Sequence, residues 1–116
     1  MTIDRIDPVP TQYSKAVVKG DTVHLAGLIA HDWNKDIRGQ TEEVFAQIDE
    51  LLAKADASKS NLVTMTVYIA SFDDYAAFKE TYAKWIDHAA LPARATVGAV
   101  LLDPKIRIEI VAMATR

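Results

Sequence analysis

Two charged residues in the C-terminal quarter of the chain are the strongest candidates for chemistry. Arg94 follows Pro92-Ala93, where a predicted helix gives way to a strand, and such element ends line binding sites more often than strand centres do. Glu109 stands between Ile108 and Ile110 in an otherwise apolar strand. A carboxylate in such a place needs a partner, water or a ligand. The two strands are joined by a short turn at Asp103-Pro104, so we expect them to pair as a hairpin that brings both charges to one end or groove.

Each of these residues also has a purely structural interpretation. Arg94 could be an ordinary surface arginine. Glu109 could keep an edge strand from aggregating, paired with Arg107 or with a lysine across the sheet. Position alone leaves both interpretations open.

Most other catalytic chemistry is missing from the sequence. There is no cysteine, which excludes disulfides, thiolate metal sites and a cysteine nucleophile. His24, His31 and His88 have no metal-ligand spacing, and no phosphate-binding loop, glycine-rich dinucleotide turn or nucleophile elbow is present. We therefore predict neither metal nor cofactor. An enzyme built from what remains must work by positioning water and stabilising charge.

Composition limits the class of protein further. The 116 residues, half hydrophobic and a quarter charged, predict one globular domain over 1–116. The net charge is −3, from 13 basic and 16 acidic residues. The basic residues are dispersed, which disfavours a nucleic-acid partner. No signal-peptide core and no run of about 18 apolar residues occurs, so we expect a cytoplasmic protein without membrane contact.

Strands are predicted on both sides of a central helical region. Residues 16–19 and 22–26 flank Gly20-Asp21, which is a hairpin signal. Residues 1–14 read as an extended lead-in, because Pro8 and Pro10 prevent a helix there, and an extra N-terminal strand is a further option. A loop follows at 27–39. Later strands are expected at 61–70, 95–102 and 105–115, and Val63, Met65, Val67 and Ile69 should share one face.

Two amphipathic helices are predicted between these strands. The first spans 41–56, with Thr41 as N-cap and Glu42 and Glu43 in its first turn. The second opens at Ser71, with Asp74 completing the cap, and ends before Pro92. Their apolar residues recur at helical spacing: Val44, Ile48, Leu51, Leu52 and Ala55 in the first; Tyr75, Phe78, Tyr82, Trp85 and Ile86 in the second.

This order of elements favours an α+β fold. Two helices separated by one strand can cover the same face of a mixed or antiparallel sheet of about five or six strands, as in ferredoxin-like or chorismate-mutase-like folds. Ile106, Ile108 and Ile110 should meet the helices. The opposite face, with Val111, Met113, Leu25 and Tyr68 as its expected members, is too apolar to stay exposed. We expect it to pack on another subunit.

Several segments together resemble the RidA/YjgF family. The most specific is Pro92-Ala93-Arg94-Ala95-Thr96-Val97 with Glu109 twelve residues further on. Tyr13-Ser14-Lys15-Ala16 is similar to the family's Tyr-Ser-Gln-Ala segment, and Val23-His24-Leu25-Ala26-Gly27 to its strand ending in Ser-Gly. Gln40-Thr41 at the first helix and Leu62 to Ala70 before the second also fit, so the resemblance spans almost the whole chain.

The resemblance implies a fold, an activity and a site. It implies a chorismate-mutase-like subunit in a homotrimer with sites between subunits. The implied activity is hydrolysis of 2-imino and enamino acids, such as 2-aminoacrylate, to 2-keto acids and ammonia, without cofactor or metal. Arg94 would anchor the substrate carboxylate through both oxygens, and Glu109 would position and activate the attacking water. Tyr13, Thr96, Ala26 and Gly27 would line the substrate pocket.

The sequence departs from the family pattern at several of these positions. Gly-Pro before the tyrosine is replaced by Thr11-Gln12. Ala26 replaces a serine, Leu28 a glutamine, Thr96 a cysteine, and Lys79 an asparagine of the second helix. These changes remove polar groups from the implied pocket and favour a bulkier or more apolar imino acid. Three alternatives stay open. One is a module that binds a small carboxylate without catalysis, and another is an RNA-cleaving or translation-inhibiting role, against which the acidic charge counts. The third is a specialised deaminase in catabolism, for example of aminomuconate or aminoacrylate-type intermediates in a ring-degradation pathway.

Overall fold

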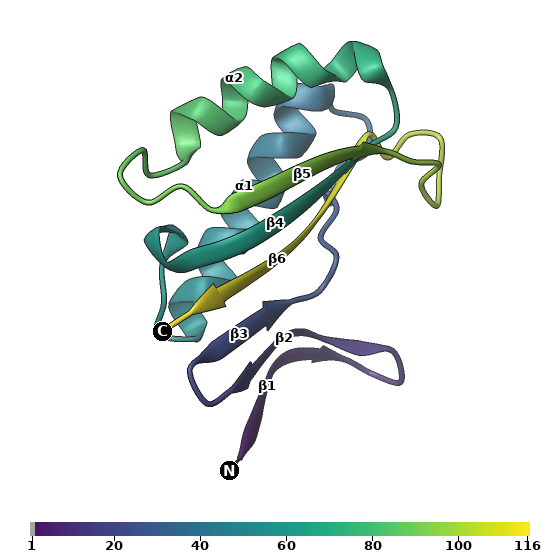
Figure 1. The fold of residues 1–116 in the computed structure, drawn as a ribbon. Coiled ribbons are helices and arrows are strands. Elements are labelled where there is room, and N and C mark those ends of the chain that lie inside the picture. Colours follow the sequence, from purple (N-terminus) through teal and green to yellow (C-terminus); the bar gives the residue numbers. More distant parts are fainter. Residues whose placement is uncertain (1) are drawn as a thin grey trace.

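The protein is built on one six-stranded sheet that carries both helices on the same face (Figure 1). The computed structural model describes residues 2–116. In space the strands follow the order β1-β2-β3-β6-β4-β5. The predicted α+β class, with two helices covering one face, is confirmed. The elements are β1 (Ile3–Val9), β2 (Tyr13–Lys19), β3 (Thr22–Leu25), α1 (Ile37–Lys54), β4 (Leu62–Ile69), α2 (Tyr75–Trp85), β5 (Ala93–Gly98) and β6 (Ile108–Thr115), with short 3-10 turns at Lys59–Asn61 and Phe72–Asp74.

The N-terminal strands form as the turn residues predict. β2 and β3 pair antiparallel as far as Lys19 and Thr22, and Gly20 between them adopts a φ of 60°, which glycine reaches without steric cost. The optional N-terminal strand is real, since β1 pairs along β2. Pro8 is tolerated because β1 is the edge strand.

Helix α1 begins four residues before its predicted start. Asp36, not Thr41, is the N-cap, and its Oδ1 accepts a hydrogen bond of 2.8 Å from the Gly39 nitrogen. Aspartate is among the strongest N-caps, so it outweighs the unfavourable Gly39 in the first turn. Glu42 and Glu43 therefore lie in the second turn, and the first turn contains no acidic residue.

The start of α2 also differs from its predicted capping box. Ser71 caps the 3-10 turn before the helix, where its Oγ accepts from the Asp73 nitrogen at 3.2 Å. The Asp74 carboxylate does not return to the backbone. It binds Arg107 instead, through two hydrogen bonds of 2.9 and 2.7 Å. A charged bidentate partner is stronger than a neutral N–H.

The helices bury the face of the sheet that the isoleucines occupy. Ile106, Ile108 and Ile110 are fully buried, and so is the predicted stripe of α1. In α2 only Phe78 and Ile86 of the predicted five are fully buried, while the larger aromatic side chains keep one edge in solvent.

Two residues of the sheet face the other way from their prediction. Leu25 lies in the core and not on the opposite face, because it pairs with the buried Ala16 across the hairpin. Val63 is exposed, since the register of β4 against β6 shifts between Leu62 and Thr64. A bulge of this kind reverses the alternation of side chains, so Leu62 enters the core in its place.

The largest departure from prediction concerns β5. The expected hairpin of β5 with β6 does not form. β5 runs parallel to β4 at the edge of the sheet, and β6 lies on the other side of β4. The reason is α2, which carries the chain back to the end of the sheet where β4 begins. β5 can therefore run in the same direction as β4, and β4-α2-β5 is a parallel crossover unit. The chain then passes over the end of β4 to reach β6 (Figure 1).

Candidate functional site

Arg94 is held on the helix side of the sheet by aromatic residues of α2. Its guanidinium carbon lies 4.6 Å from the ring centre of Tyr82 and 5.3 Å from that of Phe78. Its Nη2 donates a hydrogen bond of 3.5 Å to the Tyr75 hydroxyl. Burial raises the pKa of Tyr82 more than the positive charge of Arg94 lowers it. The three rings fix the guanidinium without neutralising it, because no ion pair within residues 2–116 includes Arg94.

Thr96 adds an unused polar atom beside Arg94. Its Oγ1 is buried and has no hydrogen-bond partner within the described residues. Both side chains line one cavity of about 240 Å³, together with Ile69, Phe72, Tyr75 and Gly98. Buried hydroxyls without a partner are rare in folded proteins. An unpaired guanidinium and an orphaned hydroxyl in one cavity are suited to binding a carboxylate.

Glu109 belongs to a second cluster of predicted residues. The segment after β3 forms a two-way bridge with β6, in which Leu28 and Ile110 exchange hydrogen bonds of 2.9 and 3.0 Å. This bridge places Gly27 against Glu109 so closely that a Cβ at position 27 would overlap the glutamate Oε2. Glycine at this position is therefore what leaves room for the carboxylate.

The other predicted pocket residues lie around Gly27. Tyr13, at the start of β2, is half exposed and shares a cavity of about 370 Å³ with Gly27. The Ala26 nitrogen donates to the Lys15 carbonyl at 2.9 Å, which ties this segment to β2. Glu109 itself lines a hollow of about 430 Å³ beside Tyr68, Val111 and the loop 99–102. No ion pair of the described chain includes Glu109.

Within one protomer, the two clusters lie on opposite faces of the sheet. Arg94 pairs with Met65, whose side chain is buried under the helices, whereas Glu109 pairs with Tyr68 on the face that the helices leave uncovered. The expectation that a hairpin brings both charges into one groove is therefore wrong for the single chain. Arg94 and Thr96 form one cluster, and Gly27 and Glu109 form the other. Tyr13 shares with Gly27 a cavity that Glu109 does not line.

The structural interpretation of Glu109 also fails. β6 is an interior strand, so Glu109 protects no edge. Arg107, its expected partner, is bound to Asp74, and the Asp74 carboxylate raises the pKa of Arg107.

A residue that the sequence did not single out organises this region. Gln40 of α1 is fully buried. Its Nε2 donates to the carbonyls of Trp33, Lys35 and Lys105, and its Oε1 accepts from the Arg107 nitrogen at 2.9 Å. One amide thus joins the two loops that precede α1 and β6. Its sequence signal was the Gln40-Thr41 match to the family at the start of the first helix.

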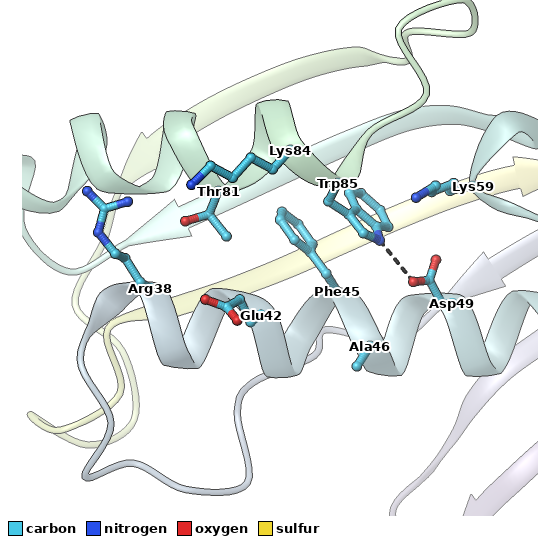
Figure 2. A pocket seen from close by; sticks show the side chains of 9 residues that line it. All are labelled: Arg38, Glu42, Phe45, Ala46, Asp49, Lys59, Thr81, Lys84 and Trp85. Atoms are coloured by element: carbon cyan, nitrogen blue, oxygen red, sulfur yellow. Dashed lines mark hydrogen bonds between the residues drawn. The ribbon is translucent and has the colours of Figure 1, made fainter.

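A further hollow, of about 550 Å³, lies between α1 and α2 on the side away from the sheet (Figure 2). Phe45 and Trp85 stack there with ring centres 4.1 Å apart, and the Trp85 indole donates to Asp49 at 2.9 Å. Arg38 at its rim is paired with Glu80. None of the predicted site residues lines it. Phe45, Trp85 and Asp49 are thus engaged with one another, and Arg38 with Glu80.

His31 lines the cavity that Tyr13 shares with Gly27, whereas His24 and His88 line neither this cavity nor the one beside Arg94. His24 is exposed on β3, and the His88 ring lies 2.6 Å from the Ala83 carbonyl. Among residues 2–116, no group of three acidic or histidine side chains could hold a metal ion. In the same part of the chain no helix is long and apolar enough to cross a membrane.

Comparison with known proteins identifies the family. The family model described as Endoribonuclease L-PSP matches residues 2–116. The chain belongs to the RidA/YjgF family. A RutC family protein of Haemophilus influenzae is 38% identical over 116 residues, covering 99% of each chain. The RutC family protein YoaB of Escherichia coli is 34% identical and covers 95% of each. The solved structure of NMB1025, a YjgF family member from Neisseria meningitidis, superimposes with a TM-score of 0.95 at 31% identity, over 100% of this chain and 96% of that one.

Family membership agrees with the observed fold but does not identify the reaction, which has to be argued from the residues of the site. The names of these relatives specify no substrate. The RidA/YjgF assignment covers the whole described chain, including both clusters of predicted residues.

Proposed function

We propose that this protein hydrolyses 2-imino acids to 2-keto acids and ammonia at sites shared between neighbouring subunits of a homotrimer. The observation that carries the proposal is the unpaired Arg94 guanidinium, held rigid by three rings beside the orphaned Thr96 hydroxyl. A ligand carboxylate would satisfy both groups, and a bidentate arginine holds such a group in one orientation. Membership in the RidA/YjgF family, which includes imine deaminases, supports the same activity.

The second cluster supplies the base. Glu109 faces the uncovered side of the sheet, where Val63, Val97 and Val111 are all more than a third exposed. Large apolar surfaces of this kind favour subunit contact. In a closed ring, the Glu109 face of one subunit meets the Arg94 edge of the next, and the two clusters form one site. Its ligand is then an imino acid, and its product a keto acid.

The chemistry requires few groups. Water adds to the carbon of a protonated imine while Glu109 accepts one of its protons. Glu109 then returns this proton to the nitrogen of the carbinolamine, and the carbon–nitrogen bond breaks. The hydroxyl proton leaves with the departing ammonia, so the products are the 2-keto acid and ammonium, and Glu109 is again a carboxylate. An enamine such as 2-aminoacrylate first gains a proton at its terminal carbon to become the imine. Because a protonated imine is already electrophilic, positioning substrate and water provides most of the acceleration.

The decisive experiment generates imines in place and follows their removal. An amino-acid oxidase produces the imine, semicarbazide traps what remains, and wild type is compared with Arg94→Ala and Glu109→Gln. We expect wild type to deplete the trapped imine, and each variant to lose at least about a hundredfold in kcat/KM. Equal trapping with and without wild-type protein, across several side chains, would contradict the deaminase and favour a module that only binds carboxylates.

Mixing the two inactive variants tests the shared site. If Arg94 comes from one subunit and Glu109 from the next, co-refolded Arg94→Ala and Glu109→Gln chains should regain about a quarter of wild-type activity in random trimers. Light scattering verifies that the mixture is trimeric. Trimers that regain nothing would contradict the shared arrangement.

The description of the family model as an endoribonuclease supports a second candidate, cleavage of RNA. The dispersed basic residues and the net charge of −3 give it little electrostatic support. RNA cleavage that survives rigorous purification and disappears in Arg94→Ala would favour it over the deaminase.

A further inference from the structure

We propose that Lys79 forms a second anion subsite beside Arg94 and directs the enzyme toward imino acids with two carboxylates. This inference rests on the proposed function and names its substrate class. It differs from the expectation of a bulkier or more apolar substrate.

The geometry begins at Tyr75. The hydroxyl of Tyr75 accepts from Arg94, and the face of its ring carries the Lys79 ammonium, which lies 5.4 Å from the ring centre. Lys79 stands one helical turn after Tyr75 in α2, a spacing that places both side chains on one face of the helix. A single tyrosine therefore separates the two positive groups, and its ring favours the ammonium in this position.

No carboxylate of the protein compensates these two charges. The ion pairs of the described chain include neither Lys79 nor Arg94. The two acidic residues nearest to Lys79 in the sequence form ion pairs elsewhere: Glu80 pairs with Arg38, and Asp74 with Arg107. The cavity wall around Arg94 contains no acidic side chain. Two positive groups that contact the same tyrosine and have no acidic partner in the described chain favour a ligand that carries two negative charges.

The cavity beside Tyr75 has the size for such a ligand. Lys79 is not one of its lining residues, but its ammonium lies over the ring of Tyr75, which lines the wall. Its volume of about 240 Å³ is that of roughly eight liquid water molecules, enough for a short dicarboxylic acid. In the proposed pose, Arg94 binds the carboxylate next to the imine carbon. Lys79 binds the terminal carboxylate, which takes no part in bond making or breaking. Phe72 and Ile69 contact the methylene groups between them.

Two imines of equal chain length test the subsite. 2-Iminoglutarate and 2-iminopentanoate both have five carbons and differ in the terminal carboxylate alone. The measured quantity is the ratio of their kcat/KM values, obtained with semicarbazide trapping. We expect Lys79→Met to lower this ratio about tenfold, the scale of one charged hydrogen bond. Lys79→Arg, which keeps a cation over the Tyr75 ring, should restore it.

Lys84→Met is the matched control. Lys84 lies on the same helix but lines the groove between α1 and α2, and it is Lys79, not Lys84, that lies over the Tyr75 ring, so the ratio should stay at the wild-type value. The inference is overturned if Lys79→Met leaves the ratio unchanged, or if Lys84→Met lowers it equally.

Calorimetric titration separates failure of the subsite from failure of the deaminase. 2-Oxoglutarate and 2-oxopentanoate bind without any reaction. If neither imine is hydrolysed but Lys79→Met weakens 2-oxoglutarate binding selectively, the proposed function fails and the subsite stands. If 2-iminopentanoate, whose side chain is uncharged, is hydrolysed and Lys79 affects neither turnover nor binding, the subsite fails and the deaminase stands.

Discussion

Two arginines thirteen positions apart in the sequence have opposite surroundings. Arg107 has its charge neutralised inside the protomer, by two hydrogen bonds to Asp74, whose side chain is almost fully buried. Arg94 is surrounded by the rings of Phe78 and Tyr82 and the hydroxyl of Tyr75, and no acid of the described chain reaches it. The first arrangement leaves the guanidinium nothing further to bind. The second orients a guanidinium while keeping its carboxylate-binding edge free.

This difference distinguishes polar groups that stabilise the fold from polar groups that are available to bind a ligand. Gln40 and Arg107 have their hydrogen bonds completed by neighbouring loops. Thr96 and Arg94 are placed as rigidly and lack polar partners of equal strength. Buried polar groups are nearly always paired in folded proteins. The unpaired Thr96 hydroxyl beside a guanidinium that no acid neutralises, both in one cavity, is therefore a better sign of function than charge alone.

Replacing Arg107 tests the structural half of this comparison and should have the largest effect on stability. Arg107→Met leaves the Asp74 carboxylate buried without its partner. We expect a loss of about 2 kcal/mol in the free energy of unfolding, a buried-pair value reduced because Arg107 is partly exposed. Urea denaturation measures this loss. Imine hydrolysis per folded molecule should stay within about threefold of wild type, because no reacting group is removed.

Arg38→Met is the control for this prediction. The Arg38–Glu80 pair has the same 2.7 Å separation as the Arg107–Asp74 pair, but both of its side chains are exposed. Its loss should cost less than about 1 kcal/mol. Equal destabilisation by both variants would mean that burial of Asp74 is not what gives the Arg107 pair its stability.

Periodicity and turn residues predicted most of the fold. The stripe of α1, the isoleucine face of β6 and the hairpin at Gly20 are local patterns, each of which fixes its own structure. The position of β5 was not predicted because strand neighbours depend on the path of the whole chain. The Asp103-Pro104 turn suggested a hairpin, and only the crossover through α2 shows that β5 returns to the far side of β4.

The candidate site could be predicted residue by residue but not as an arrangement. Local motifs singled out Arg94 and Glu109. Their separation by the thickness of the sheet follows from the registers in which β5 and β6 pair with β4, which no motif contains. The aromatic setting of Arg94 was partly visible, since Tyr75, Phe78 and Tyr82 share one stripe of α2. That this stripe also supports an arginine requires β5 to lie beneath it.

A change at Gly27 tests the second cluster. In Gly27→Ala, the new Cβ would overlap Oε2 of Glu109 and push the carboxylate from its position. We expect kcat for imine hydrolysis to fall about tenfold, which corresponds to ~1.4 kcal/mol of lost transition-state stabilisation. The free energy of unfolding should change by about 1 kcal/mol or less, because the displaced atom ends a flexible side chain.

A double variant shows whether this effect passes through Glu109. In a Glu109→Ala background there is no carboxylate to displace, so adding Gly27→Ala should leave the residual activity unchanged. A further tenfold loss in that background would place the effect of Gly27 elsewhere in the pocket.

The smallest effect is expected at Tyr82, the ring that lies closest to Arg94. Tyr82→Phe keeps the ring and should change the free energy of unfolding at pH 7 by no more than about 0.5 kcal/mol. The difference should appear in alkali. Because burial raises the pKa of Tyr82 in the fold, its phenol ionises more readily in the unfolded chain, and stability is lost as the pH rises above about 10. Wild type should therefore lose more stability than Tyr82→Phe between pH 9 and 11, as measured by urea unfolding at each pH.

A companion measurement tests the effect of Arg94 on the pKa of Tyr82. Its positive charge opposes the effect of burial on the pKa of Tyr82, so Arg94→Ala should raise that pKa further. The alkaline difference between Arg94→Ala and the Arg94→Ala/Tyr82→Phe double variant should then extend to higher pH than it does between wild type and Tyr82→Phe. Identical pH profiles for the two pairs would mean that the guanidinium does not act on this ring in solution, and the aromatic support of the anchor would have to come from Phe78 and Tyr75 alone.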